Sequence, residues 1–268
     1  MGADLERISL RRVPMVLMYH CIDESTFDPY GVCVTPHRLA QQMAWLADHG
    51  LHGVSMSELV DAMRAGRERG LVGLTFDDGY VGLREHAVPV LQRHDFTATM
   101  YIVSGLLGGT NEWDKGPVRR LVSADDVLRL AAAGMEIGAH TVSHSRLAGI
   151  GAERLKTEIS DSRSQLSELL GRPTRGFAYP WGAMDAAARQ AVRDAGFDHA
   201  CAVETPMADL GVMGLPRIIF NQHDDMRRIA AKKLFFRSYT AYRGTYRQLS
   251  YNPGLRAAKR RLSALAGR

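Results

Sequence analysis

The hydrophobic pattern alternates short apolar runs with longer amphipathic stretches from residue 13 to residue 220. The apolar runs lack the polar residue at every second position that a half-exposed strand shows, which indicates strands buried on both faces. The longer stretches repeat apolar residues every three or four positions, as helices do. Alternating strands and helices predict a parallel sheet covered by helices, as a barrel or a doubly wound sheet.

The predicted elements can be placed along the sequence by their caps and turns. Thr35 and Pro36 start a helix as N-cap and first-turn proline, and Ser123 with Asp126 forms a second capping pattern. Strands are predicted at 13–20, 51–54, 71–76, 97–103, 135–140, 175–180, 199–203 and 217–220. Helices are predicted at 36–49, 57–65, 123–134, 152–170 and 185–195.

Polar residues with chemical capacity lie at the ends of several predicted strands. They are His20, Asp77, Asp78, His140, Pro180 and Trp181. Because parallel strands in either arrangement place their C-terminal ends on one face, we expect these residues to converge. The sequence has no GxGxxG after its first strand and no GxxxxGK[ST], which argues against a nucleotide-binding sheet.

The segment "HTVSH" places His140 and His144 four residues apart, a spacing that lets two imidazoles meet one metal ion. Such a pair is weak evidence for a metal site on its own. Asp78, from another strand end, would complete a set of two nitrogen ligands and one oxygen ligand. That set leaves coordination positions open for water and substrate. Asp77 is then the candidate base for the activated water, although two acids before a helix can also simply stabilise its N-terminus.

The composition is that of a globular protein, with 46% hydrophobic residues and a net charge of +5. No apolar run approaches the roughly 20 residues that span a bilayer, and acidic residues precede the first apolar run, which argues against a signal peptide. The three cysteines, Cys21, Cys33 and Cys201, are odd in number and lack metal-site spacing. We therefore expect reduced thiols and a cytoplasmic location.

Three motifs, "TFDDG", "HTVSH" and "FAYPWG", in this order resemble the leading motifs of the polysaccharide deacetylase family, the NodB-homology domains of carbohydrate esterase family four. The similarity covers roughly Val13 to Ile219. It implies an α/β fold that is a distorted, incomplete (β/α) barrel, with residues 1–225 as the catalytic domain and 226–268 as an extension. It also implies a divalent metal held by Asp-His-His and removal of acetyl groups from N-acetylated sugars.

The resemblance assigns roles residue by residue. Asp77 matches the catalytic base, and the metal ligands are Asp78, His140 and His144. The backbone N–H of Trp181 matches the group that holds the oxyanion. The substrate-binding candidates are Tyr179, Pro180, Trp181 and Trp113, the last in a Gly-rich loop where it either stacks on a sugar or anchors the loop to the core.

Two positions depart from the common family pattern. Many members carry an arginine two residues before the proline of the third motif, where this chain has Ala178 and resembles the poly-N-acetylglucosamine deacetylase subgroup. Arg217 is a possible replacement that orients Asp77, unless it forms a surface ion pair. Most members supply the general acid from a histidine in a late motif, which His223 would match in this chain. The subgroup instead uses a histidine after the first strand, so His20 is preferred.

The expected reaction is metal-dependent hydrolysis of an acetamide on an N-acetylated sugar. Alternatives are another non-peptide amide, an O-acetyl ester, or a sugar-binding protein without turnover. Zinc is the first expectation for the metal, and cobalt, nickel, manganese or iron would suit the same ligands.

The C-terminal extension is basic and aromatic. Residues 226–268 hold 12 of the 34 basic residues and no acid, so residues 1–225 carry 22 basic and 29 acidic groups, a net charge of −7. Its aromatic residues either pack on the barrel or, with the basic residues, bind an anionic membrane surface near a lipid-linked substrate. Nucleic acid is not expected as a partner, because the acidic body would repel phosphates.

Overall fold

The computed structural model describes residues 14–24, 27–203, 211–234 and 236, and a curled parallel sheet lies at its centre. The strands are β1 (Val16–Tyr19), β4 (His52–Val54), β5 (Leu71–Phe76), β6 (Thr99–Ile102), β7 (Glu136–Ala139), β8 (Gly176–Ala178), β9 (His199–Cys201) and β10 (Ile218–Ile219). Their order is β10-β1-β5-β6-β7-β8-β9, and β4 also pairs with β5. The predicted incomplete (β/α) barrel is confirmed.

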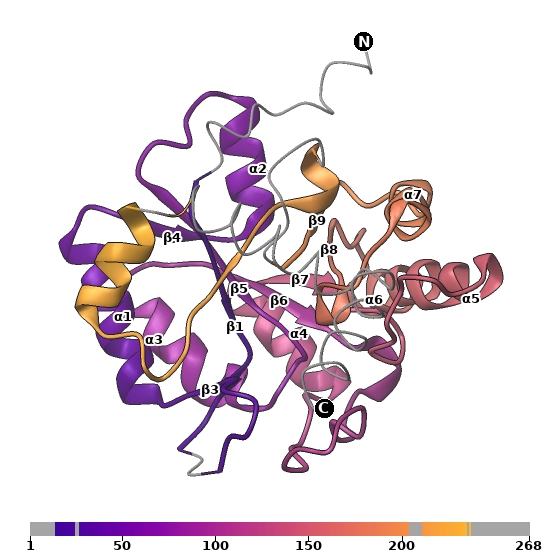
Figure 1. Ribbon diagram of the computed structural model, residues 1–268, viewed down its shortest axis with the longest axis horizontal. Coiled ribbons are helices and arrows are strands. Elements are labelled where there is room, and N and C mark those ends of the chain that lie inside the picture. The colour runs from indigo at the N-terminus through magenta and orange to yellow at the C-terminus, as the bar shows by residue number, and fades with distance from the viewer. Residues whose placement is uncertain (1–13, 25–26, 204–210, 235, 237–268) are drawn as a thin grey trace, which may run out of the picture.

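Helices surround this sheet on its outer side (Figure 1). They are α1 (Pro36–Asp48), α2 (Met56–Arg64), α3 (Val88–Gln92), α4 (Ala124–Ala132), α5 (Ala152–Lys156), α6 (Ser162–Leu170) and α7 (Ala186–Asp194). Thr35 caps α1 by accepting a hydrogen bond from the amide of Arg38 at 3.2 Å, as the sequence predicts. The predicted cap at Ser123, reciprocated by Asp126, is also present at the start of α4.

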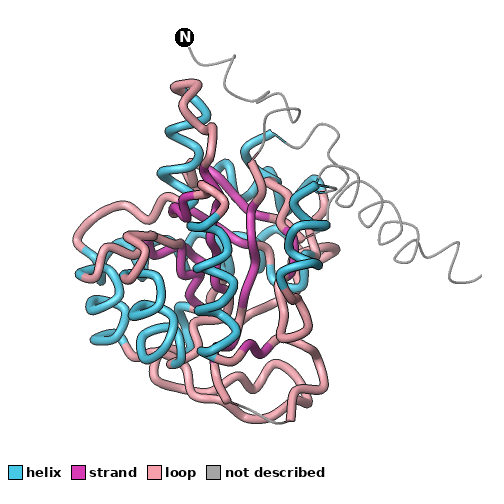
Figure 2. The backbone as a smooth tube through the Cα atoms, turned by 90° about the vertical axis from the view of Figure 1, so that its left-hand side faces the viewer, coloured by secondary structure: helices cyan, strands magenta, loops and turns pink. Residues whose placement is uncertain are grey.

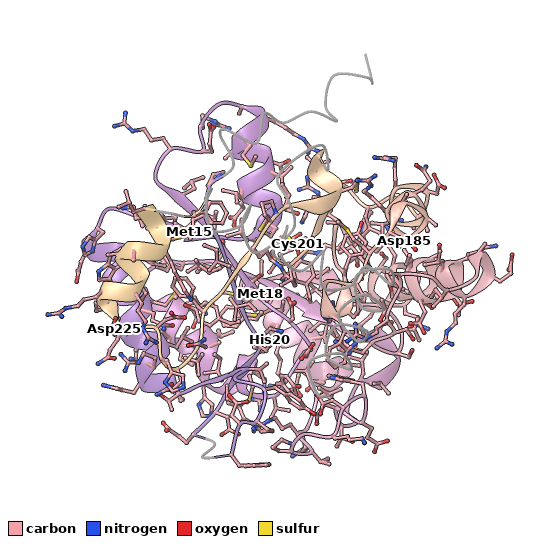
Figure 3. The ribbon with its side chains drawn as sticks, in the orientation of Figure 1. Met15, Met18, His20, Asp185, Cys201 and Asp225 are labelled. Carbon is pink, nitrogen blue, oxygen red and sulfur yellow. The ribbon has the colours of Figure 1, made fainter. Side chains whose placement is uncertain are left out.

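The strands of the central sheet are parallel, so their C-terminal ends lie at one edge. β1 pairs with β5 from Val16 opposite Gly73 to Tyr19 opposite Phe76. In Figure 3, β1 descends from Met15 through Met18 to His20, and the loops gather at that lower end in Figure 2. The register therefore places the residue after β1 beside the residue after β5.

Two helical features differ from the sequence prediction. The predicted helix at 152–170 is interrupted by a π-helical turn at Thr157–Asp161 between α5 and α6. A second π-helical turn at Leu83–Ala87 leads into α3, and this helical segment was not predicted. A π turn bonds residues five apart, so the hydrophobic spacing departs from the usual α-helical repeat.

A small second sheet lies at the C-terminal end of the central strands. It pairs β2 (Cys21–Ile22) with β3 (Cys33–Val34), again in parallel. Gly82 lies against β2 so closely that a Cβ at this position would be 2.0 Å from the carbonyl oxygen of Ile22. Only glycine fits there, and the close approach holds the small sheet against the chain that follows β5.

The described start of the C-terminal extension is a helix at 226–234. Its Ile229 is buried in the main core, and Lys232 donates to the carbonyl of Ile219 and to Asp224, both at 2.7 Å. Phe236 is also buried in the main core, whereas residues 235 and 237–268 lie outside the described residues, so membrane contact by the tail stays a prediction. Within the described ranges, every helix is too short or too polar to cross a bilayer.

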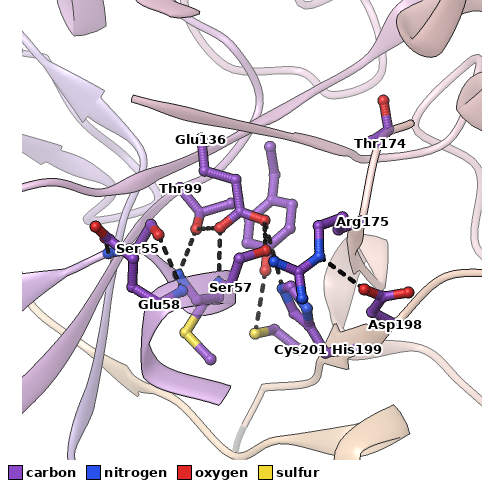
Figure 4. A network of polar contacts seen from close by, with 12 residues as sticks. Ser55, Ser57, Glu58, Thr99, Glu136, Thr174, Arg175, Asp198, His199 and Cys201 are labelled. Atoms are coloured by element: carbon purple, nitrogen blue, oxygen red, sulfur yellow. Dashed lines mark hydrogen bonds and ion pairs between the residues drawn. The ribbon is translucent and has the colours of Figure 1, made fainter. Parts of the chain in front are cut away.

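A polar network closes the opposite, N-terminal end of the sheet (Figure 4). Glu136 accepts hydrogen bonds from the amide and hydroxyl of Ser57 at 2.9 and 2.5 Å and from the hydroxyl of Thr99 at 2.6 Å. His199 is fully buried with Nε2 3.8 Å from Glu136 Oε1. Neither of its ring nitrogens has a hydrogen-bond partner in the part of the chain that the structure describes.

We expect His199 to make folding stability fall with acidification. Burial lowers the pKa of His199, and the nearby Glu136 carboxylate opposes this only in part. Below pH about 6.5 the unfolded chain binds a proton that the folded chain does not, so the unfolding free energy drops by up to about 1.4 kcal/mol per pH unit. Urea unfolding at pH 7.5 and 5.5 should show a larger loss in the parent protein than in His199→Gln.

The exposed His37 offers the matched control, because His37→Gln should keep the parent's pH dependence. Equal losses in the parent and in His199→Gln would contradict the prediction.

Candidate active site

Asp78, His140 and His144 form one buried cluster at the C-terminal end of the sheet. Their ligand atoms all lie within 4.8 Å of one another. Asp78 Oδ1 is 3.4 Å from His140 Nε2 and 3.2 Å from His144 Nε2. The structure thus brings together the three side chains that the sequence proposed as metal ligands.

The cluster fits a divalent cation. Asp78 Oδ1 is buried without a hydrogen-bond partner among the described residues, although a buried carboxylate oxygen normally has one. His140 Nδ1 lies 2.8 Å from the carbonyl oxygen of Ala178, so Nδ1 carries the proton and Nε2 keeps its lone pair for a metal. Burial lowers the pKa of His144, which favours the neutral form that ligates metals.

Unusual backbone conformations present these ligands. Asp78, Thr141, His144 and Trp181 have φ values of 73°, 66°, 59° and 60°. Non-glycine residues rarely adopt this left-handed region, which costs energy and clusters at functional sites. Gly79 follows Asp78 with φ 76°, so two successive left-handed residues turn the chain sharply after β5. This turn explains the glycine in "TFDDG".

The loop that carries His144 is held by Glu158, which the sequence analysis missed. Glu158 accepts from the amides of Val142 and Ser143 at 3.1 and 3.0 Å, and from the hydroxyls of Ser143 and Ser145 at 2.5 and 2.8 Å. It lies in the π-helical turn between α5 and α6. No local sequence signal identifies this partner, because the turn and the loop meet only in the folded chain.

Asp77 has a different partner from its neighbour. Arg217, which is fully buried, contacts both carboxylate oxygens of Asp77, with Nη1 to Oδ1 at 2.6 Å and Nη2 to Oδ2 at 2.7 Å. It also donates to the Thr75 hydroxyl at 3.0 Å and to the carbonyl of Ala202 at 3.2 Å. Two alternatives were open for Arg217, a partner of Asp77 or a surface ion pair. In the structure Arg217 is buried and pairs with Asp77.

The environment of Asp77 keeps it ionised. Burial raises the pKa of its carboxyl, but the Arg217 guanidinium more than offsets this and leaves the pKa below its ordinary value. Asp77 and Asp78 are adjacent in sequence, yet one faces an arginine and the other faces two imidazoles. The two carboxylates therefore have separate chemical surroundings.

His20 and His223 lie in different settings. His20 directly follows Tyr19, whose carbonyl accepts a hydrogen bond from the amide of Asp77 at 2.9 Å. His223 is exposed in the loop after β10, where its carbonyl accepts from Arg228 and its amide donates to Asn221. Both histidines follow strands that end at the same edge of the sheet, but β1, which precedes His20, pairs directly with β5, which precedes Asp77.

Aromatic side chains border the histidine ligands. The Trp113 ring lies 4.3 Å from the His144 ring, and the Trp181 ring lies 5.0 Å from it, measured between centroids. Trp181 Nε1 also donates to the carbonyl of His144 at 3.3 Å, and the guanidinium of Arg146 lies 4.8 Å from the Trp181 ring centre. Trp113 is partly exposed and packs on a small apolar cluster with Tyr80.

Tyr179 does not fit its predicted place among the substrate-binding side chains. Its side chain is fully buried, and its hydroxyl donates to the carbonyl of Met213 at 3.0 Å. Successive side chains of an extended segment point to opposite sides, so Tyr179 faces the core. Pro180 is also buried, and with Trp181 it begins a single 3₁₀ turn at Pro180–Gly182.

Several known proteins resemble this chain. YxkH of Bacillus subtilis (strain 168), a protein named for the polysaccharide deacetylases, is 24% identical over 207 residues, which are 76% of this chain and 70% of YxkH. The poly-beta-1,6-N-acetyl-D-glucosamine N-deacetylase of Escherichia coli (strain K12) is 31% identical over 87 residues, 31% of this chain and only 13% of that protein.

A solved structure shows the same fold. The Streptococcus pyogenes deacetylase PplD in complex with acetate superposes with a TM-score of 0.70 at 24% identity, covering 81% of this chain and 96% of PplD. The profile of the polysaccharide deacetylases matches residues 64–200, which is just over half of the 268 residues. That match includes all three residues of the buried Asp-His-His cluster. The chain therefore belongs to the polysaccharide deacetylase family.

Proposed function

We propose that the protein is a metal-dependent hydrolase that removes the acetyl group from an N-acetylated sugar. The observation that carries this proposal is the adjacent pair of carboxylates, with Asp78 in a cluster suited to a cation and Asp77 paired with Arg217. A structural metal site needs no ionised acid beside it. A hydrolytic site does, because a base must take the proton from the attacking water.

Asp78, His140 and His144 would hold the cation, and zinc suits two imidazoles and one carboxylate. When bound, such a cation lowers the pKa of water and polarises the carbonyl of the acetyl group. Asp77 takes the proton of the attacking water, and Arg217 fixes the orientation of its carboxylate through two hydrogen bonds. The backbone N–H of Trp181 faces the developing oxyanion from the 3₁₀ turn after β8.

His20 is the general acid in this proposal. Breaking the amide bond requires a proton on the leaving nitrogen, and a histidine supplies it near neutral pH. The products are acetate and the free amino sugar. Trp113, partly exposed beside His144, offers an aromatic face for the sugar ring.

The two histidines can be separated experimentally. His20→Asn is expected to lower kcat by about 100-fold or more, because a general acid usually contributes at least that much to the rate. KM should change little. His223→Asn, at an exposed position, should change kcat by less than about two-fold. Steady-state kinetics on one N-acetylated sugar would measure both. A larger loss in His223→Asn than in His20→Asn would reverse the assignment.

The similar proteins support an amide substrate. One relative is named as an N-deacetylase of poly-beta-1,6-N-acetyl-D-glucosamine, in which the acetyl group is attached through an amide. An O-acetyl ester or another non-peptide amide would use the same residues. A cytoplasmic location, with the basic tail at a membrane that carries a lipid-linked sugar, completes the proposal.

Metal removal tests the reaction directly. Protein treated with a chelator should release no acetate from N-acetylglucosamine oligomers, and added zinc should restore release. Asp78→Asn should lose metal content as well, since one of three ligands becomes neutral. Acetate release that persists without metal would refute the proposal, and release only from O-acetylated sugars would favour the ester alternative.

A further inference from the structure

Two buried thiols face each other next to the active site. Cys21 in β2 and Cys33 in β3 are register partners, and both are free thiols with exposed fractions of 3% and 5%. Their thiols are close enough for each to influence the pKa of the other. They belong to one small apolar cluster, with Tyr80 and Leu121. The pair therefore shares one side of the small sheet, with both side chains in the same apolar cluster.

The backbone spacing suits a disulfide. Neighbouring strands lie about 4.8 Å apart, and a disulfide joins residues whose Cα atoms are about 4.4–6.8 Å apart. Cys21 and Cys33 are directly paired across β2 and β3, with the amide of Cys21 donating to the carbonyl of Val32 at 3.2 Å. A bond between the sulfurs needs only a small movement of two short strands.

One thiol of the pair is the better nucleophile. The hydrogen bond from Cys21 lowers the pKa of Cys33, and the guanidinium of Arg119 adds to this effect. Arg119 lines the same cavity as Cys21 and forms an ion pair with Asp23 at 3.1 Å. A nearby cation and a donated hydrogen bond are the features that make a cysteine react as a thiolate.

A small oxidant has a way to reach the pair. Cys21 lines a cavity of about 270 Å³, whose walls include Tyr80, Glu85, His86 and Arg119. This space admits a peroxide but not a folded protein. A small oxidant can therefore reach Cys21 through this cavity, while Cys33, which does not line it, keeps an exposed fraction of 5%.

We propose that Cys21 and Cys33 are a peroxide-sensitive modification site that closes to a disulfide and thereby slows the hydrolase. The Cys33 thiolate attacks one oxygen of hydrogen peroxide, the O–O bond breaks, and the departing hydroxide takes a proton to become water. The Cys21 sulfur then attacks the sulfenic sulfur, the S–O bond breaks, and a second water leaves. Two thiols and one peroxide become one disulfide and two waters.

The disulfide would act on the active site through two short connections. Cys21 is the residue after His20, the proposed general acid. Tyr80 belongs to the same apolar cluster as the two cysteines and lies two residues after Asp78. Shortening the S–S separation to a bond of about 2.05 Å moves β2 and with it His20. A misplacement near 1 Å can cost about 100-fold in rate.

The test uses the intact protein and a convenient peptide. Cys21 and Cys33 lie in one tryptic peptide, 13–38, while Cys201 lies in another, 194–217. After treatment with hydrogen peroxide and alkylation under denaturing conditions, peptide 13–38 should carry no alkyl group and be lighter by two hydrogen atoms. Peptide 194–217 should be alkylated. Acetate release should fall by about ten-fold or more, and dithiothreitol should reverse both changes.

Three variants complete the experiment. Cys33→Ser and Cys21→Ser should form no link and keep their activity in peroxide, whereas Cys201→Ser should behave as the parent does. If a serine variant fails to fold, the parent's peptide mass still decides the matter. Peptide 13–38 recovered with two alkyl groups, or with a sulfinic acid and no link, would overturn the proposed disulfide.

The activity half of this inference depends on the proposed hydrolase function. A disulfide that forms without loss of acetate release would overturn the coupling to the active site. A parent protein that releases no acetate even when reduced would refute the hydrolase function, while the peptide mass would still test the disulfide separately.

Discussion

Replacing Asp77 with asparagine is expected to lower acetate release by about 100- to 10,000-fold while the bound metal remains. The variant keeps Asp78, His140 and His144 but loses the carboxylate that Arg217 orients as the base. General-base catalysis contributes about 10²–10⁴ in rate, which sets the size of the loss. Metal content by elemental analysis and turnover on an N-acetylated sugar would measure the two effects.

Two controls separate catalysis from folding. Asp78→Asn should lose metal and activity together, since it removes a ligand. Asp77→Asn leaves Arg217 buried without its counter-charge, so circular dichroism must show a folded protein, and Asp77→Asn/Arg217→Gln should be equally inactive. Turnover in Asp77→Asn within about ten-fold of the parent would end the assignment of Asp77 as the base.

The second large effect concerns stability. Arg217→Met is expected to lower the unfolding free energy by about 3–5 kcal/mol, because it leaves the Asp77 carboxylate buried without its partner. Arg217 also donates to Thr75 and Ala202, so the loss includes those hydrogen bonds. Urea unfolding of the parent and the variant would give the difference.

The double variant Asp77→Asn/Arg217→Met identifies the cause. Once the charge on residue 77 is gone, losing the guanidinium should cost less, so the two substitutions should be non-additive by at least about 2 kcal/mol. Arg217→Lys should restore only part of the stability, because one ammonium cannot make the paired contacts to both oxygens. Strictly additive losses would mean that Arg217 stabilises the fold independently of Asp77.

The central sheet and most helices could be predicted from the sequence because their signals are local. Thr35 and Pro36 mark the start of α1, and the buried strands stand out as apolar runs. The helical segment from Leu83 to Gln92 was missed because a π-helical turn breaks the spacing that identifies a helix. The pairing of β2 with β3 was missed because two-residue strands carry no pattern.

The metal-ligand candidates were found because the fold class constrains them. Parallel strands end at one edge, so Asp78 after β5 and His140 after β7 had to lie near each other. The sequence analysis named Tyr179 as a substrate-binding candidate, but its side chain is buried in the structure. A motif places its residues on a segment, but which side chain faces the cavity depends on the turn at Trp181 and on the carbonyl of Met213.

The sequence by itself determined the parallel α/β class, the edge at which polar residues gather and the residue types that suit a metal, since these follow from periodicity and spacing. Only the tertiary structure decided that Arg217 pairs with Asp77, that Glu158 holds the "HTVSH" loop and that Cys21 faces Cys33. Arg217 lies 140 positions from Asp77. Contacts at such separations depend on how the sheet curls, and no local pattern of hydrophobic and polar residues records that geometry.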